Sequence, residues 1–343
     1  MNIAFGIEND IQHEIGEIGY EWWYYDCVSL EEDYCVVLIF FRDIPMLPAC
    51  IRERSQRTNR IHNFDGVTIS IYHKKKKIAQ KLLWSKKYKT FYDQQEHHLQ
   101  FAQSFVQYSN GHYSLFVDFR AGQDSRRIRF SAEFDDSIIY SNGNTHQTPT
   151  EHTWIAVSPK LSGQCNLEIW DEDHLKISKS FLAHAYHDHN IGVMPVFEEF
   201  YSWYWGKVVC NFGTLVYYYV PDNSNNSPLH WACIFLDSTN QPIILRDVFI
   251  GEGKKKISYA GIYYTKELFI TGFTNEGEKI EVNIHQNSTL ENGPFYLRFA
   301  SVATLKINSS IYSDSHSIGE YFHAQRLRSK IVQTFIELPW EEI

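Results

Sequence analysis

Residues 105–119, FVQYSNGHYSLFVDF, indicate the fold class of this chain. Asn110-Gly111 favours a two-residue turn between antiparallel strands, because both residues tolerate the positive φ that such a turn requires. From Tyr113 to Phe119 an apolar residue stands at every second position, so these side chains share one face of a strand. The stretch therefore predicts a β-hairpin with one buried face and one solvated face.

Strand patterns of this kind continue along most of the chain. Apolar and polar residues alternate again between Arg127 and Phe134, and Lys74–Lys77 separates two apolar runs as the tip of another hairpin. Only residues 320–335 contain enough Ala, Gln, Arg and Leu to predict a short helix. Many short strands joined by turns predict an all-β chain built from antiparallel barrel or sandwich domains.

The length of 343 residues accommodates two such domains. We place the boundary near Pro195. Residues 1–195 then form an N-terminal β domain, and residues 196–343 form a C-terminal β domain that ends in the short helix.

Composition and charge exclude several functional classes. A net charge of -9 and a pI near 6.0 disfavour a nucleic-acid-binding surface. No stretch approaches the roughly 18 consecutive apolar residues of a membrane-spanning helix, and the N-terminus lacks the pattern of a secretory signal. Six cysteines without a CxxC pair are typical of free thiols in a reducing compartment. We therefore expect a cytoplasmic protein without a nucleic-acid partner or stable membrane insertion; the pattern does not indicate its oligomeric state.

Residues 184–190, HAYHDHN, contain three histidines and a carboxylate. On a strand, successive side chains point to opposite faces, so Asp188 lies on one face and His187 and His189 lie on the other. His184 falls on the face of Asp188, and the three histidines do not converge. Because a zinc site needs three or four converging ligands, we predict no metal at this stretch.

Tyr186 and Asp188 share one face of this strand, and His152 and Trp154 share a face of an earlier one. If the two faces border one cavity, they combine an acid, hydrogen-bonding groups and aromatic walls. Burial raises the pKa of a carboxyl group, and a protonated Asp can transfer its proton to an alkene while aromatic faces stabilise the cation. The alternative is that these residues are hydrogen-bonded core groups packed among aromatics. The residue pattern leaves both interpretations open.

Several motifs, in order along the chain, resemble the hydroxyneurosporene synthases, or carotenoid 1,2-hydratases, and the related AttH-like proteins. The matching segments are Glu21-Trp22-Trp23-Tyr24-Tyr25-Asp26, His152-Thr153-Trp154, Tyr186-His187-Asp188-His189-Asn190 with Gly192, Trp203-Tyr204-Trp205-Gly206-Lys207, and Gly319-Glu320-Tyr321. The resemblance implies two lipocalin-like β-barrel domains with a largely apolar cavity. The same superfamily includes fungal proteins that promote Diels–Alder cyclisation, so it implies the fold more firmly than the reaction.

The resemblance also implies a site, in which Asp188 donates a proton to an isoprenoid double bond and neighbouring groups tune or replenish that proton. The matching catalytic set is Asp188, Tyr186, His152 and Trp154. We expect substrate to be bound by Trp23, Tyr25, Asn190, Trp203 and Trp205. No cofactor is expected, and the predicted ligand is an apolar isoprenoid or polyene.

Three functions stay open at this point. In the first, Asp188 protonates an alkene and the cation is captured by water, which makes a hydratase, or internally, which makes a cyclase. In the second, the cavity restrains a polyene for a pericyclic cyclisation that needs no proton donor. In the third, the protein binds its ligand without changing it.

Overall fold

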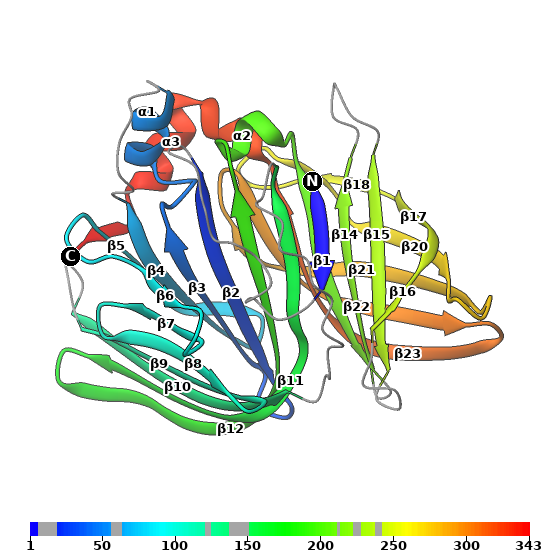
Figure 1. Ribbon diagram of the computed structural model, residues 1–343, viewed down its shortest axis with the longest axis horizontal. Helices are drawn as coiled ribbons and strands as arrows, with labels where there is room; N and C mark the ends of the chain where they lie inside the picture. The colour runs from blue at the N-terminus through cyan, green and yellow to red at the C-terminus, as the bar shows by residue number, and fades with distance from the viewer. Residues whose placement is uncertain are drawn as a thin grey trace. The chain divides into compact units, whose positions relative to one another are not determined.

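The computed structural model describes residues 1–5, 19–55, 64–120, 125–136, 151–210, 213–221, 228–236 and 242–343. Strands make up 68% of the structure and helices 9%, which confirms the predicted all-β class. The chain divides into two compact units (Figure 1). The first unit contains Met1–Val196 and Gln333–Ile343, and the second contains Phe197–Val332.

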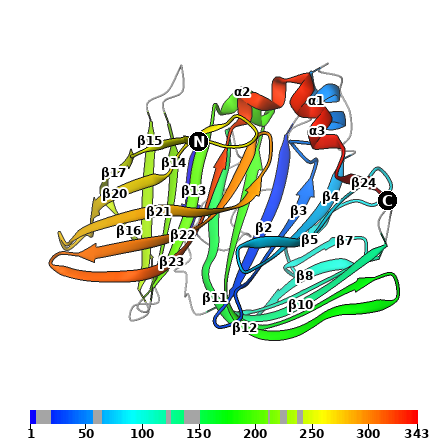
Figure 2. The same cartoon turned by 180° about the vertical axis from the view of Figure 1, so that it is seen from behind.

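In the curled sheet of the first unit, the first and last long strands are neighbours in the middle of the strand order. Its neighbours follow chain order from β2 to β5 and from β6 to β12, and β12 then pairs with β2 in antiparallel register. We call the β2–β12 pairing the first seam. Figure 2 shows β2, β3, β4 and β5 side by side. The strands are β1 (Asn2–Phe5), β2 (Tyr20–Ser29), β3 (Tyr34–Arg42), β4 (Asp65–His73), β5 (Lys76–Ser85), β6 (Phe91–Asp93), β7 (His98–Phe101), β8 (Ser104–Ser109), β9 (His112–Phe119), β10 (Arg126–Asp136), β11 (Thr153–Asp171), β12 (His174–Gly192) and β24 (Trp340–Glu342).

The second unit repeats this plan with fewer strands. Its neighbours run in chain order from β13 to β16 and from β17 to β23, and β23 pairs with β13. We call the β13–β23 pairing the second seam; β18 and β19 form a small separate sheet. The strands are β13 (Trp203–Cys210), β14 (Gly213–Val220), β15 (Leu229–Leu236), β16 (Pro242–Ile244), β17 (Arg246–Glu252), β18 (Lys255–Ile257), β19 (Tyr263–Thr265), β20 (Glu267–Phe273), β21 (Lys279–Asn292), β22 (Tyr296–Ile307) and β23 (Ser310–Phe322).

Both hairpins that the sequence predicts in the first unit are confirmed. Asn110 and Gly111 have φ values of 52° and 80° between β8 and β9, as a primed turn requires. Lys74 and Lys75 have φ values of 49° and 61° between β4 and β5. Local turn chemistry therefore sets the register of these strand pairs.

The helices are short and differ in part from the prediction. They are α1 (Pro48–Ser55), α2 (Val196–Glu199), the 3₁₀ helix η2 (Ala324–Arg328) and α3 (Lys330–Glu337). The predicted helix at 320–335 begins later, because β23 continues to Phe322 in ladder with β13. Helix α1 begins at Pro48, which the first turn of a helix tolerates. In the described part of the chain, no helix is both long and apolar enough to cross a membrane.

The last residues of the chain belong to the first unit rather than the second. Strand β24 pairs in parallel with β5, and the Lys81 ammonium lies 3.3 Å from the Glu341 carboxylate. Helices α1 and α3 lie side by side in Figures 1 and 2. Arg52 of α1 forms an ion pair with Glu337 of α3. The segment 196–343, expected as one domain, is thus split, since its end completes the sheet edge at β5.

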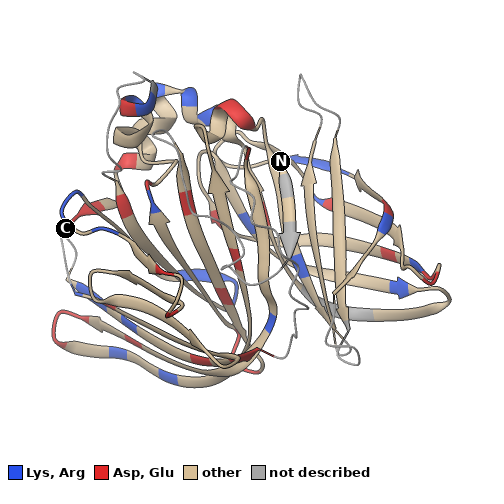
Figure 3. Ribbon diagram, viewed as in Figure 1, with Lys and Arg blue, Asp and Glu red and all other residues tan. Residues whose placement is uncertain are grey.

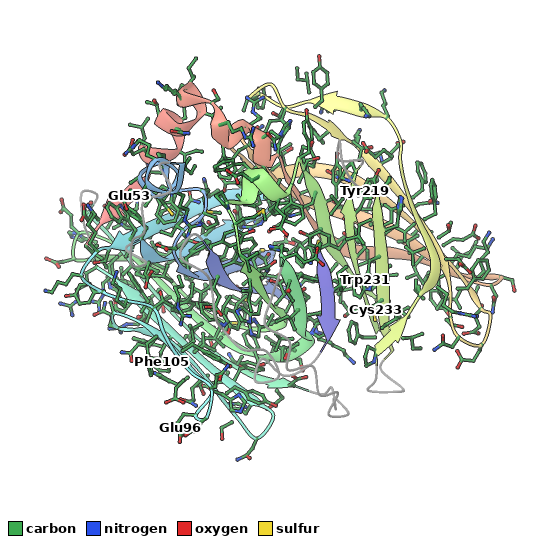
Figure 4. The ribbon with its side chains drawn as sticks, turned by 45° about the horizontal axis from the view of Figure 1, so that its top comes forward. Glu53, Glu96, Phe105, Tyr219, Trp231 and Cys233 are labelled. Carbon is green, nitrogen blue, oxygen red and sulfur yellow. The ribbon has the colours of Figure 1, made fainter. Side chains whose placement is uncertain are left out.

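Side chains fill the interior of the first unit (Figure 4). Trp23, Tyr25 and Cys27 of β2 and Ala183 and Ala185 of β12 belong to its hydrophobic core. Two cavities in the unit have volumes of about 20 and 10 Å³, each about the size of one water. Odd-numbered residues at the first seam therefore point into a packed core, and even-numbered residues point away from it.

Charged residues of both signs are intermixed along the described strands and loops (Figure 3). Acidic residues outnumber basic ones in the whole chain, which has a net charge of -9.

Candidate functional site

The even-numbered face of β12 brings together most of the predicted catalytic residues. Strand β12 is paired on both sides: Asp188 lies opposite Tyr24 of β2, and Asn190 lies opposite Trp154 of β11. Opposite residues in an antiparallel ladder point to the same face. Tyr186, Asp188, Asn190 and Trp154 therefore share one face, and each is at most 4% exposed.

A chain of hydrogen bonds runs across this face and ends at Asp188. The Tyr20 hydroxyl lies 2.9 Å from His152 Nδ1, and His152 Nε2 lies 3.2 Å from Asn190 Oδ1. Asn190 Nδ2 donates to Asp188 Oδ1 at 2.8 Å, and the Tyr186 hydroxyl donates to Asp188 Oδ2 at 2.9 Å. We call these five side chains the acid chain. Both oxygens of Asp188 thus accept a hydrogen bond.

The proton positions in the acid chain follow from its donors and acceptors. Burial lowers the pKa of His152 to about 3, because desolvation disfavours the imidazolium ion. His152 is therefore neutral at pH 7 and carries one ring proton. Asn190 Oδ1 can only accept, so His152 Nε2 donates to it and Nδ1 accepts from Tyr20. His152 can orient Asn190 in this neutral form, and its predicted role in tuning or replenishing the proton of Asp188 stays a prediction.

The predicted residues Trp23 and Tyr25 lie on the opposite face of the seam from Asp188. Tyr25 stacks on His187 with ring centroids 3.9 Å apart, and Trp23 stacks on His189 at 4.8 Å. These four rings point into the packed core, as the alternation of β2 requires. Trp23 and Tyr25 therefore do not share a face with Asp188, and their predicted role in substrate binding stays a prediction. The divergence of His187 and His189 from Asp188 agrees with the predicted alternation.

A buried ionic cluster, which the sequence did not reveal, occupies the core side of the first seam. His189 Nε2 lies 2.8 Å from Glu21 Oε1, and Arg42 lies 2.8 Å from Glu21 Oε2. Glu21 and His189 are fully buried, so Arg42 offsets a charge that would otherwise be costly to bury. Within the residues that the structure describes, no group of three or more His, Cys, Asp or Glu side chains is arranged to hold a metal ion.

Sequence reasoning also missed a second carboxylate on the face of Asp188. The Tyr24 hydroxyl donates to Asp26 Oδ2 at 3.2 Å, and Asp26 lies opposite Tyr186 in the ladder. Tyr24-Tyr25-Asp26 has the same Tyr-x-Asp spacing as Tyr186-His187-Asp188. That repeated spacing was the available signal.

Gly192 has a steric role at the same seam. A Cβ at this position would come within 2.1 Å of the Tyr20 ring, which lies directly across the ladder. Glycine thus leaves room for the ring whose hydroxyl bonds to His152. Trp22 stacks on that ring at 5.2 Å, which holds the start of the acid chain in place.

The remaining predicted residues, Trp203 and Trp205, belong to the second unit. They lie on the side of β13 that points away from the core of that unit, whereas Tyr204 points into the core. Trp203 stacks on Phe322 with centroids 4.1 Å apart and planes 4° from parallel. Both Trp side chains are buried, so each packs at the second seam.

Glycines at the second seam also accommodate a tyrosine. Gly206 lies opposite Gly319, and a Cβ on either would lie 2.5 or 3.0 Å from the Tyr217 hydroxyl. Burial raises the pKa of Tyr217, because its phenolate would be desolvated. The glycines of the WYWGK and GEY motifs are thus explained by close packing.

The second unit contains a larger cavity, of about 360 Å³. Its wall includes the rings of Tyr204 and Tyr321, whose centroids are 4.4 Å apart, and the Glu252 carboxylate. Lys255 lies 3.7 Å from Glu252, so the two charges offset one another. Pockets of this size commonly hold small molecules.

Comparisons with known proteins agree with this geometry. The family model described as carotenoid hydratase CrtC matches residues 53–244, more than half of the chain. A curated relative, the hydroxyneurosporene dehydrogenase of Chlorobaculum tepidum, is 23% identical over 98% of this chain and 91% of its own length.

Solved structures share the fold at low sequence identity. CghA superposes with a TM-score of 0.61 at 12% identity, covering 91% of this chain and 90% of that one. An AttH protein of Nitrosomonas europaea gives 0.54 at 10% identity, covering 90% and 93%. Kievitone hydratase of Nectria haematococca gives 0.54 at 9% identity, covering 92% of each chain. These likenesses confirm the predicted lipocalin-like architecture.

The family model and the solved structures are consistent with each other for this chain. The structural neighbours support the fold, and the family model matches a segment that includes His152, Trp154, Tyr186 and Asp188. The predicted enzyme class, a hydratase, is that of the matching family. The chain belongs to the carotenoid hydratase CrtC family.

Proposed function

We propose that this protein adds water to a double bond of an apolar acyclic isoprenoid or polyene, with Asp188 as the proton donor. The observation that carries the proposal is the convergence of Asn190 and Tyr186 on the two oxygens of one buried carboxyl group. The family description names a hydratase of carotenoids. The curated relative is named as a dehydrogenase of hydroxyneurosporene, which is a different reaction on a hydroxylated polyene. Both names support a polyene substrate.

The surroundings of Asp188 suit the transfer of a proton to a carbon atom. Before transfer, the Tyr186 hydroxyl accepts from the protonated carboxyl group; afterwards Tyr186 and Asn190 both donate to the carboxylate. Donors aimed at the charge that develops lower the barrier, because they need no reorganisation. Tyr24 lies opposite Asp188 on β2, and Trp154 lies opposite the neighbouring Asn190 on β11. Their aromatic faces are candidates to stabilise the tertiary cation.

A second candidate function is ligand binding in the second unit. The observation that favours it is the cavity of about 360 Å³, which is far larger than the cavities of about 20 and 10 Å³ in the first unit. A protein of this kind would return its ligand unchanged. A pericyclic reaction would instead give an isomer of the substrate without solvent hydrogen.

Product analysis separates these functions. Purified protein is incubated with an acyclic polyene in deuterated water, and the product is analysed by mass spectrometry. Hydration adds one water and places one deuterium on carbon, dehydrogenation removes two hydrogens, and cyclisation leaves the elemental composition unchanged. We expect the hydrated product from the wild type and none from Asp188→Asn. A product without carbon-bound deuterium contradicts the proposal.

A further inference from the structure

Two copies of one short motif face each other across the first seam. Tyr24-Tyr25-Asp26 lies on β2 and Tyr186-His187-Asp188 lies on β12, and the strands run antiparallel. In the ladder, Asp188 is opposite Tyr24 and Asp26 is opposite Tyr186. The four side chains therefore form an alternating square of two phenols and two carboxyl groups on one face. A local twofold relation connects its halves.

Hydrogen bonds tie each carboxyl group to the tyrosine of its own strand. Tyr186 donates to Asp188 at 2.9 Å, and Tyr24 donates to Asp26 at 3.2 Å. Asp26 and Asp188 occupy a diagonal of the square, and the backbones of diagonal neighbours in such ladders are about 7–8 Å apart. Both are buried, with Asp26 2% exposed and Asp188 4% exposed. The pair is thus close, desolvated and held at a fixed spacing.

The geometry points to Asp26 as a second catalytic residue, the base that accepts a proton from the attacking water while Asp188 acts as the acid. This inference rests on the proposed hydration. Addition of water to an alkene needs both roles, because one proton is delivered to carbon and another leaves the oxygen. Inverting glycosidases, which pair an acid and a base carboxyl group around a water, hold these groups about 6.5–9.5 Å apart. Two residues on a ladder diagonal have backbones about 7–8 Å apart, which leaves room for a water between their carboxyl groups.

Bonds and protons balance in the proposed hydration. The O–H bond of Asp188 breaks and a C–H bond forms at the less substituted alkene carbon, which leaves a tertiary cation and the Asp188 carboxylate. Water then forms a C–O bond to the cation, and one of its protons passes to the Asp26 carboxylate. The products are a tertiary alcohol, ionised Asp188 and protonated Asp26. No oxidant or reductant takes part.

The tyrosines of the square provide a route by which the proton returns. Each turnover moves one proton from Asp188 to Asp26, and the next turnover needs it back on Asp188. The rings of Tyr24 and Tyr186 meet edge to face, 6.1 Å between centroids. A phenol both donates and accepts, so it can pass a proton between neighbours. Like charges at this spacing also favour a state in which the two carboxyl groups share one proton.

Two substitutions separate the acid from the base in deuterated water. The experiment follows alcohol formation and the gain of carbon-bound deuterium in the recovered alkene. With Asp26→Asn, we expect alcohol formation to fall about 100-fold or more, the usual effect of losing a general base. Deuterium should still enter the recovered alkene, because the cation formed by Asp188 loses a proton back to it. With Asp188→Asn, both signals should disappear.

The outcomes distinguish this inference from the proposed function. Asp26→Asn that forms alcohol at the wild-type rate overturns the role of Asp26 and leaves that of Asp188 intact. Loss of both signals in folded Asp26→Asn also overturns it, because a base is not needed for protonation. Retention of both signals in Asp188→Asn overturns the proposed role of Asp188 as the proton donor.

A milder variant keeps the inference testable if Asp26→Asn does not fold. Tyr24→Phe preserves the ring and the Asp26 carboxylate, and removes only the hydroxyl that orients it. Tyr24 acts here as a positioning residue, so the ratio of alcohol to exchanged alkene should fall in a single turnover, which needs no return of the proton. An unchanged ratio contradicts the inference. Asp118→Asn, at a buried carboxylate that pairs with Arg127 on β10, is the matched control.

Discussion

The two units share a strand order but differ in what their seams carry. In each unit the last strand of the sheet pairs with the first, and an Arg–Glu pair links a seam strand to its neighbour. The pairs are Arg42–Glu21 in the first unit and Arg298–Glu320 in the second. Beyond this, the first seam carries the acid chain, whereas the second carries stacked aromatics and a close-packed pair of glycines. The same strand pairing thus carries a hydrogen-bonded polar face in the first unit and a packing face in the second.

The Arg–Glu pairs should matter equally for stability in both units. Arg42→Met leaves Glu21 buried beside His189 without its cation, and Arg298→Met does the same to Glu320. Removing one partner of a buried pair costs about 3–5 kcal/mol in the free energy of unfolding. Urea denaturation, with hydrogen exchange as the readout in each unit, measures this loss of stability. If both variants destabilise the same unit, the two Arg–Glu pairs do not have equivalent roles.

The tyrosines of the two seams should differ in their effect on catalysis. Tyr186→Phe removes a donor to the Asp188 carboxylate, and a hydrogen bond to a charged group contributes about 1.5–3 kcal/mol, or roughly 10- to 100-fold in rate. Tyr204→Phe removes the hydroxyl that accepts from the Thr265 amide in the second unit. It should destabilise that unit and leave the rate of proton transfer unchanged. If Tyr186→Phe and Tyr204→Phe slow the single-turnover reaction equally, the two tyrosines do not have separate roles in catalysis and in stability.

The glycines should behave alike, because each makes room for a tyrosine. Gly192→Ala places a methyl group against the Tyr20 ring, and Gly206→Ala places one against Tyr217. Overpacking of this kind typically costs about 1–3 kcal/mol. Thermal unfolding reports both losses, but only Gly192→Ala should also slow hydration, through the Tyr20–His152 contact. Wild-type activity in Gly192→Ala would show that the acid chain does not need Tyr20.

His152 should give the first unit a pH-dependent stability. Its pKa falls from 6.5 to about 3 on folding because of burial, so the unfolded chain binds more protons between these values. Stability from this group is complete above pH 6.5 and is lost as the pH falls, by at most about 1.4 kcal/mol per unit. The free energy of unfolding of wild type minus that of His152→Gln should therefore decrease from pH 6.5 to 4.

The comparison with His152→Gln isolates that one group. Burial raises the pKa of Asp65 to about 6, which contributes with the opposite sign, but Asp65 is present in both proteins and cancels. A constant difference between the two proteins across this pH range contradicts the neutral, buried assignment of His152.

Local patterns in the sequence predicted the fold well and the site only in part. Turn chemistry and alternation are properties of neighbouring residues. The Asn110-Gly111 hairpin and the opposite faces of His187 and Asp188 could therefore be predicted from the sequence. The first seam could not be predicted, because β2 and β12 are more than about 150 residues apart and their register depends on the folding of the whole sheet. For the same reason the sequence alone did not pair Asp26 with Tyr186.

The same logic explains the residues that were misplaced. Trp23 and Tyr25 were grouped with Asp188 by motif resemblance, although the alternation of β2 turns them toward the core. The segment after Glu337 was assigned to the second domain by its position in the chain, but it completes the sheet of the first unit. In both cases long-range pairing decided the outcome.

The most direct test of the account is the single-turnover rate of carbon–deuterium bond formation in deuterated water, measured for Asp188→Asn against Asp118→Asn. Both substitutions replace a buried carboxyl group of the first unit with an amide of the same shape, and both proteins should keep the wild-type fold by circular dichroism. We expect the rate of carbon–deuterium bond formation to fall about 100-fold or more in Asp188→Asn and to stay at the wild-type value in Asp118→Asn. A rate for Asp188→Asn within a few-fold of wild type would contradict the claim that Asp188 delivers the proton.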